Sequence, residues 1–226
     1  MKKQTWLILF AVILTIHLAG IALKNQLLEY ISKPMLVASL ALYFLAQTNE
    51  IVSGIKKWIL LALIFSWAGD VLLLFQPKGS IFFLLGLSAF LLAHIFYILF
   101  FHQVRVKEKI KNNVWPAVIV VIYYAGLIIL LSPYLGDMKL PVRIYGIVIS
   151  FMFMLAMHML FLKNKAAGTY MMAGALLFVI SDSLLAINKF YQSFEPAGIV
   201  IMLTYVLAQL FIVEGSIRYM TSVDKE

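Results

Sequence analysis

The segment IFFLLGLSAFLLAHIFYILFF, residues 81–101, decides the class of fold. It runs without an Asp, Glu, Lys or Arg side chain. A helix of about 20 mainly apolar residues is long enough to cross the hydrocarbon core of a bilayer. Residues 81–101 therefore predict a transmembrane helix.

The composition of the whole chain extends this prediction. Of its 226 residues, 64% are hydrophobic and 12% are charged, against roughly half and a quarter in an ordinary soluble domain. A soluble protein of this size cannot bury so much apolar surface, so lipid must be the solvent for most of it. The sequence contains no cysteine, which excludes disulfides, thiol nucleophiles and Cys-ligated metal centres. We expect a multi-pass protein of the cell membrane.

Reading outward from residues 81–101, between charge clusters and turn residues, gives eight candidate spans. They are 4–23, 34–48, 57–75, 81–101, 114–132, 142–162, 168–188 and 197–217. The second is short because the Lys33-Pro34 pair is interpreted as the start of its helix, where proline is tolerated. The connections are short, so the fold class is an all-α membrane bundle forming a single domain over 1–226.

The basic residues predict the orientation of the bundle. Lys and Arg exceed Asp and Glu, giving a net charge of +8, which in a membrane protein marks cytoplasmic loops rather than a nucleic-acid partner. One side carries Lys2, Lys3, Lys56, Lys57, Arg105, Lys107, Lys109, Lys111, Lys163, Lys165, Arg218 and Lys225. The other carries Lys24, Lys33, Lys78, Lys139, Arg143 and Lys189. Twelve against six predicts that both termini are cytoplasmic.

Three acidic residues fall inside the predicted spans, where an Asp costs about 2.5–3.5 kcal/mol at the centre of a helix. Glu214 lies near the end of the last span, where water or Arg218 could satisfy it. Asp70 and Asp182 each lie some 14 residues from the cytoplasmic start of their spans, about 21 Å deep at 1.5 Å per residue. Both sit in a small-Asp-x-Leu-Leu pattern, four spans apart, which hints at a four-plus-four internal repeat. Two carboxyl groups at one depth could share one cavity.

Other polar residues of the spans are candidates to line that cavity. Tyr205 and Gln209 lie one helical turn apart. His94 and Tyr97 share a stripe with Gly86 and Phe90, although His94 counts nearer to the cytoplasmic half. The candidate substrate-binding residues are Lys33, Ser66, His94, Tyr97, Arg143, Ser181, Asn188, Tyr205 and Gln209. The outer cations, Lys33 and Arg143, could bind a lipid phosphate or could snorkel to the interface.

These residues resemble the lysoplasmalogenase-like (YhhN-type) integral membrane proteins over nearly the whole chain. The segments that carry the resemblance are Lys33-Pro34, FSWAGDVLL at 65–73, Gly86 to Tyr97, GALLFVISDSLLAIN at 174–188, and Tyr205 with Gln209. The resemblance implies a hydrolase that cleaves the vinyl ether bond of lysoplasmalogens to a fatty aldehyde and glycerophospho-ethanolamine or -choline. It implies no metal or organic cofactor. The expected partners are a lysophospholipid substrate and membrane lipids.

The chemistry of this reaction suits a pair of aspartates. Protonation of the vinyl ether carbon gives an oxocarbenium ion, so the slow step needs a protonated acid and an anion nearby, as in glycosidases. We expect Asp70 and Asp182 to be catalytic, one as proton donor and the other as cation stabiliser and base. Tyr205, Gln209 and Asn188 would orient water or the glycerol, and Lys33 or Arg143 would hold the phosphate.

Two alternatives remain open from the sequence. Paired intramembrane acids also serve as proton relays, so the chain could be a proton-coupled transporter of a small molecule or lipid. His17, His94 and His158 with one of the aspartates could in principle hold zinc. These histidines lie on different spans at unmatched depths, which disfavours a metal site.

Overall fold

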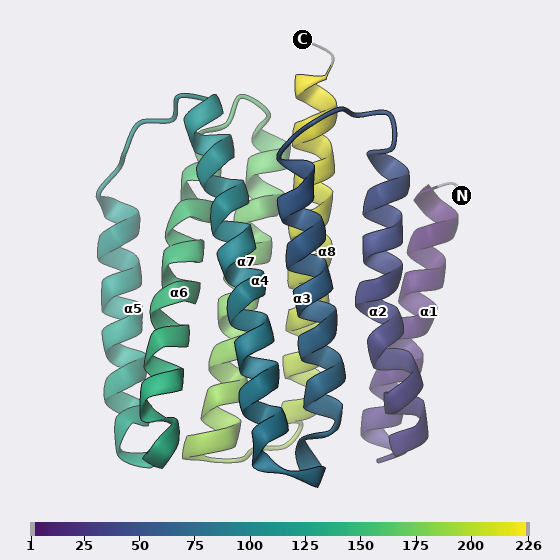
Figure 1. The fold of residues 1–226 in the computed structure, drawn as a ribbon, viewed down its shortest axis with the longest axis vertical. Helices are drawn as coiled ribbons and strands as arrows, with labels where there is room; N and C mark the ends of the chain where they lie inside the picture. Colours follow the sequence, from purple (N-terminus) through teal and green to yellow (C-terminus); the bar gives the residue numbers. More distant parts are fainter. Residues whose placement is uncertain (1–2, 225–226) are drawn as a thin grey trace.

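The computed structural model describes residues 3–224, and within them eight long helices and no strand (Figure 1). The helices are α1 (Lys3–Ala22), α2 (Gln26–Gln47), α3 (Lys56–Leu74), α4 (Ser80–Lys107), α5 (Trp115–Leu131), α6 (Lys139–His158), α7 (Lys165–Ala186) and α8 (Ala197–Val223). A π-helical turn, Ile187–Tyr191, extends α7. All eight are long and apolar enough to cross a membrane. The prediction of eight spans is confirmed.

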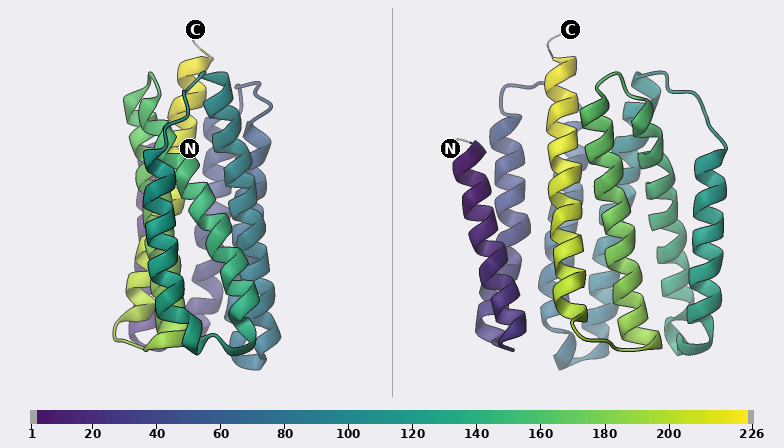
Figure 2. Two further views of the ribbon diagram at one scale, coloured as in Figure 1. Left: turned by 90° about the vertical axis from the view of Figure 1, so that its left-hand side faces the viewer. Right: turned by 180° about the vertical axis from the view of Figure 1, so that it is seen from behind.

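The helices run antiparallel to their neighbours in sequence, so α1 begins and α8 ends toward the same end of the bundle (Figure 1). The α3–α4 pair lies on one side of the bundle and the α7–α8 pair on the other, with α1–α2 and α5–α6 at the two edges (Figure 2). That the end bearing the termini is cytoplasmic stays a prediction. Lys2 and Lys225, which contribute to the charge argument, lie outside the described residues.

The start of the second helix differs from the prediction. Asn25 caps α2 by accepting a hydrogen bond from the Leu28 backbone N–H, and Pro34 lies inside the helix rather than at its start. The interpretation of Lys33-Pro34 as a start signal was therefore wrong. Membrane helices tolerate an internal proline because neighbouring groups satisfy the freed backbone carbonyl. The earlier start adds two turns to α2 and places Glu29 and Lys33 on a helix.

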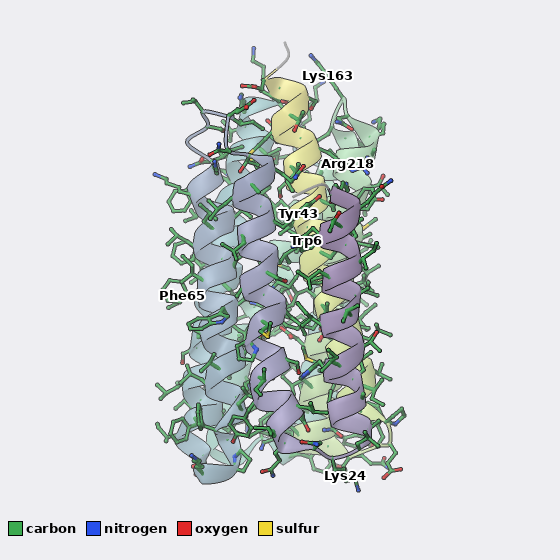
Figure 3. All side chains as sticks on the ribbon, turned by 90° about the vertical axis from the view of Figure 1, so that its right-hand side faces the viewer. Trp6, Lys24, Tyr43, Phe65, Lys163 and Arg218 are labelled. Atoms are coloured by element: carbon green, nitrogen blue, oxygen red, sulfur yellow. The ribbon has the colours of Figure 1, made fainter. Side chains whose placement is uncertain are left out.

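Small residues lie where the helices of the bundle approach one another most closely. A Cβ atom at Gly69 would lie 2.6 Å from the ring of Phe90, so the glycine allows α4 to pack against α3 directly beside Asp70. Large apolar side chains cover the outward faces, for example Phe65, which Figure 3 shows pointing away from the bundle. Ile129 on α5 is likewise 76% exposed. This surface is what lipid would cover.

Glu214 is buried, which the sequence did not predict. Its carboxylate is held by Lys3 Nζ at 2.6 Å, by the Tyr43 hydroxyl at 2.5 Å and by Arg218 Nε at 3.7 Å. Trp6 stacks on Tyr43 at 3.9 Å between ring centroids (Figure 3). The expectation of a helix-end charge was wrong because α8 continues to Val223. The contact with Arg218 is present, but as one of three that tie α1, α2 and α8 together.

Candidate functional site

A cavity of about 290 Å³ opens within the bundle, in the half that is farther from the two termini. The residues that line it come from seven of the eight long helices, all but α5, and from the turns that follow α3 and α7. Most of these residues are apolar. The polar side chains that line it are His17, Glu29, Lys33, Asp70, Gln76, Tyr145, Ser181, Asp182, Asn188 and Tyr205. The structure thus brings Asp70 of α3 and Asp182 of α7 to the same cavity.

Asp70 lies in a surrounding that suits a negative charge. Its side chain is buried, and the Tyr205 hydroxyl donates a hydrogen bond to Oδ2 at 2.7 Å. Lys33 Nζ lies 3.8 Å from Oδ1. A carboxylate can be buried when it is paired with a cation and accepts hydrogen bonds. Both neighbours of Asp70 are donors, so the geometry favours the carboxylate form.

A chain of hydrogen bonds runs from α4 through α8 to Asp70. Tyr97 donates its hydroxyl to Gln209 Oε1 at 2.5 Å, which fixes the orientation of the amide. Gln209 Nε2 then donates to Ser66 Oγ at 2.9 Å and to the Tyr205 oxygen at 3.4 Å. The Tyr205 hydroxyl is left to donate to Asp70. Apart from the branch to Ser66, each donor points along the series from Tyr97 toward Asp70. Hydrogen bonds in such a series polarise one another cooperatively.

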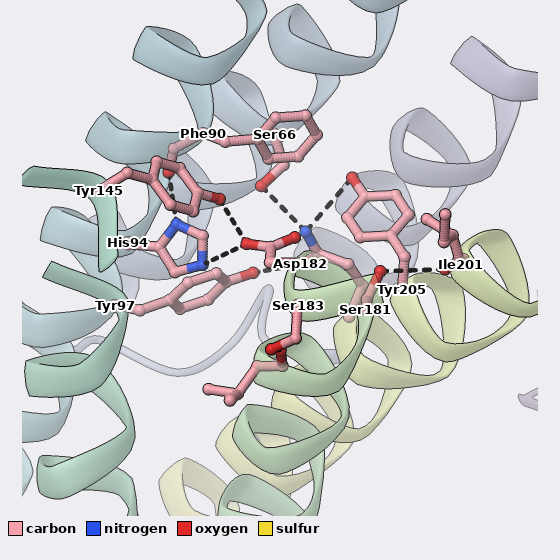
Figure 4. A network of polar contacts seen from close by, with 12 residues as sticks. Ser66, Phe90, His94, Tyr97, Tyr145, Ser181, Asp182, Ser183, Ile201 and Tyr205 are labelled. Carbon is pink, nitrogen blue, oxygen red and sulfur yellow. Dashed lines mark hydrogen bonds and ion pairs between the residues drawn. The ribbon is translucent and has the colours of Figure 1, made fainter. Parts of the chain in front are cut away.

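Asp182 has a different set of partners (Figure 4). The Tyr145 hydroxyl donates a hydrogen bond to its Oδ2, and His94 Nε2 lies 3.7 Å from the same oxygen. His94 Nδ1 donates to the Phe90 carbonyl at 2.6 Å. That bond places the ring proton on Nδ1, so a neutral His94 turns the lone pair of Nε2 toward Asp182. His94 Nε2 is buried and makes no hydrogen bond.

At 3.7 Å, Asp182 and His94 do not form a hydrogen bond, but their approach favours a proton on one of the two groups. A carboxylate oxygen and an imidazole lone pair are both acceptors, and two unshared acceptors would repel each other. A proton on Asp182 Oδ2, or on His94 Nε2, relieves that repulsion. The depth count, which placed His94 nearer to the cytoplasmic half than the aspartates, was wrong, since Nε2 lies 3.7 Å from Asp182. Helix α4 has 28 residues and extends past its neighbours, so counting from predicted span ends misplaced His94.

The remaining predicted site residues fall into three groups. Ser181 and Asn188 line the cavity, although the Ser181 hydroxyl donates to the Ile201 carbonyl and the Asn188 carbonyl accepts from the Phe194 backbone N–H. Ser66, His94, Tyr97 and Gln209 do not line the cavity, but Gln209 connects Ser66 and Tyr97 to Tyr205, and His94 faces Asp182. Arg143 does not line the cavity, and its guanidinium donates to Ser132 Oγ at 3.1 Å.

The substrate-binding prediction missed His17, Glu29, Gln76 and Tyr145 of the lining, and Tyr123 next to it. Tyr145 contacts Asp182, and Tyr123 shares a hydrogen bond with Ser183, the residue that follows Asp182. Glu29 lines the cavity but fell in a segment interpreted as a loop. A depth count on the tyrosine hydroxyls of α5 and α6 could have suggested Tyr123 and Tyr145. Glu29 needed the correct start of α2.

The zinc site that the sequence left open would need several His, Asp or Glu side chains close together. Within residues 3–224, no three His, Asp or Glu side chains come together in a way that could hold a metal ion. His17 Nδ1 bonds with Ser32 Oγ, and His158 Nδ1 donates to the Met154 carbonyl. The three histidines of the zinc alternative thus have separate partners, on α2, α4 and α6.

Comparison with known proteins decides the family. The model of the YhhN family matches residues 28–216, from the start of α2 to near the end of α8. The chain belongs to the YhhN family. The matched region contains both aspartates and all the polar side chains of the lining except His17.

Curated relatives of this YhhN-family chain carry a common name. A protein named lysoplasmalogenase from Mycobacterium bovis is 29% identical over 187 residues, covering 81% of this chain and 69% of its own length. Human lysoplasmalogenase TMEM86B is 33% identical over 165 residues, covering 70% of this chain and 62% of its own. Human lysoplasmalogenase TMEM86A is 32% identical over 71% of this chain and 65% of its own length. No solved structure matches the chain.

Proposed function

We propose that this chain is a membrane-embedded hydrolase that cleaves the vinyl ether bond of lysoplasmalogens. The products would be a fatty aldehyde and glycerophospho-ethanolamine or -choline. The names of the relatives support the activity, and the eight apolar helices support a multi-pass protein of the cell membrane. The observation that carries the proposal is the cavity lined by two aspartates with different partners.

The two aspartates divide the roles that the reaction needs. Asp70 is the anion: it pairs with Lys33 and accepts from Tyr205. Asp182 is the acid: a proton on its carboxyl group relieves the repulsion between that group and the His94 Nε2 lone pair 3.7 Å away. A buried acid and a buried anion around a developing cation form the same division of labour that glycosidases use.

The proposed reaction returns both aspartates to their starting forms. Asp182 gives its proton to the vinyl carbon remote from the ether oxygen, leaving an oxocarbenium ion beside the Asp70 carboxylate. Water adds to the cationic carbon and passes one proton to Asp70. The resulting hemiacetal collapses to the aldehyde, with its hydroxyl proton returning to Asp182. The proton on Asp70 goes to the departing glycerol oxygen, so both aspartates regain their starting forms.

The test of this function is aldehyde release by the purified protein in an uncharged detergent. A lysoplasmalogen should yield fatty aldehyde, measured by a coupled alcohol dehydrogenase. The matched lipid with a saturated ether should yield none, because it has no double bond to protonate. Absence of aldehyde from folded protein would refute the hydrolase. Movement of labelled lipid across sealed vesicles without bond cleavage would instead favour the transporter.

A further inference from the structure

Two charged residues of α2 line the cavity, and neither of them transfers a proton in the proposed chemistry. Glu29 and Lys33 are four residues apart, so they lie on one face of the helix, one turn apart. Lys33 is the deeper of the two, since its ammonium group approaches Asp70 at 3.8 Å. Glu29 lies one turn nearer to the α1–α2 connection. The wall of α2 thus carries a charge at two depths of the cavity.

The Glu29 carboxylate has no partner. In the described residues 3–224 it makes no hydrogen bond and no ion pair, and its half-buried side chain packs beside Gly20 of α1. The only cation that shares its cavity and its helix face is Lys33, which is not within ion-pair distance. His17 also faces the cavity, but its Nδ1 bonds with Ser32 Oγ. A half-buried carboxylate without a partner suits a ligand that brings its own positive charge.

The order of charges along the wall is negative, positive, negative from Glu29 through Lys33 to Asp70. A glycerophospholipid with an amine in its head group carries the complementary order. Its ammonium comes first, its phosphate next, and the carbon that becomes cationic during vinyl ether cleavage lies beyond the glycerol. Two carbon atoms join the amine to the phosphate oxygen in ethanolamine phosphate, a span comparable with one helical turn of about 5.4 Å.

We propose that Glu29 and Lys33 form the head-group subsite of this cavity, with Glu29 receiving the ammonium and Lys33 the phosphate. This inference rests on the proposed function and adds a determinant of specificity to it. Asn188 also lines the cavity, and because its carbonyl accepts from the Phe194 backbone N–H, its amide N–H groups, which make no hydrogen bond within residues 3–224, are available to a phosphate oxygen. The subsite selects zwitterionic lysolipids over those that end in a bare phosphate.

The test measures binding rather than turnover, so that it does not depend on hydrolysis. The probes are two saturated-ether lysolipids, 1-O-alkyl-glycerophosphoethanolamine and 1-O-alkyl-glycerol phosphate, titrated into the full-length protein in an uncharged detergent. Glu29→Gln should weaken binding of the ethanolamine lipid by about tenfold, the value of one charge-assisted contact. It should change binding of the phosphate lipid by less than about twofold. Free phosphoethanolamine as competitor shows whether the head group alone occupies the subsite.

Two further variants keep the test decisive. Glu195→Gln, at the same end of the bundle but outside the cavity lining, should bind both lipids as the unmodified protein does. Glu29→Lys should invert the preference toward the phosphate lipid, and this binding shows that the variant is folded. Equal weakening of both lipids by Glu29→Gln, or no weakening, overturns the subsite. If the protein releases aldehyde but Glu29→Gln does not weaken the ethanolamine lipid selectively, the subsite is refuted and the hydrolase stands. If the protein releases no aldehyde but Glu29→Gln does weaken the ethanolamine lipid selectively, the hydrolase is refuted and the subsite stands.

Discussion

The hydrogen bond from Tyr205 to Asp70 gives the sharpest prediction for catalysis. Tyr205→Phe removes one hydroxyl and keeps the ring, which packs edge-on against Phe90 and Phe178 at 5.7 and 5.5 Å between centroids. The lost bond is 2.7 Å long and, in the proposed mechanism, ends on a charged oxygen. Bonds to charged groups contribute about 1.5–3 kcal/mol, and about 1.4 kcal/mol is a factor of ten. We expect kcat for aldehyde release to fall by about ten- to a hundredfold.

The effect on folding should be much smaller, since an interhelical hydrogen bond in a membrane protein averages about 0.6 kcal/mol. Tyr43→Phe is the matched control, because it also removes a buried tyrosine–carboxylate bond, to Glu214, far from the cavity lining. It should lower the unfolding temperature in detergent while leaving kcat within about twofold. The reasoning is refuted if folded Tyr205→Phe keeps the kcat of the unmodified protein, or if the Tyr43→Phe control loses as much.

Three further predictions concern the proton donor, the packing and the orientation. His94→Phe keeps an aromatic ring but removes Nε2, so kcat should fall by about tenfold or more while KM changes little; an unchanged kcat in steady-state assays would remove the histidine from the mechanism. Gly174→Ala should cost about 1–3 kcal/mol of folding free energy, because its Cβ would lie 2.7 Å from α8 backbone atoms. The control Gly126→Ala should not destabilise the protein, because a Cβ there has nothing within 4 Å. Thermal unfolding in detergent compares the two variants. Since the chain has no native cysteine, Asp137→Cys should react with an impermeant maleimide on intact cells and Gly54→Cys only after permeabilisation, and the reverse pattern would invert the proposed topology.

The sequence alone was sufficient for the number of spans and for the prediction that Asp70 and Asp182 share one cavity. Long apolar runs leave few alternatives in a bilayer, and a carboxyl group inside such a run is expensive enough to stand out. The depth count placed both aspartates at one level, and the structure brings them to one cavity. The pairing of Tyr205 and Gln209 on one helix face was also correct as geometry.

The sequence failed where polar residues were interpreted as boundaries. Gln26, Glu29 and Lys33 made the start of α2 resemble a loop, yet two of them face a cavity rather than lipid. His94 was misplaced because α4 overshoots its neighbours, and Glu214 because its partner Lys3 comes from the other end of the chain. Such pairings depend on which helices are neighbours in space, and hydropathy carries no information about that.

Aldehyde release by the Asp70→Asn and Asp182→Asn variants tests the central claim most directly. Asp137→Asn, an exposed substitution at the same end of the bundle, is the control. General acid–base groups contribute about a hundred- to ten-thousandfold, so each cavity variant should retain at most about one per cent of kcat, while the control stays within about twofold. Both cavity variants should still unfold cooperatively and bind the saturated-ether lipid. Near-normal aldehyde release by either of them, in folded and lipid-binding protein, would contradict the account.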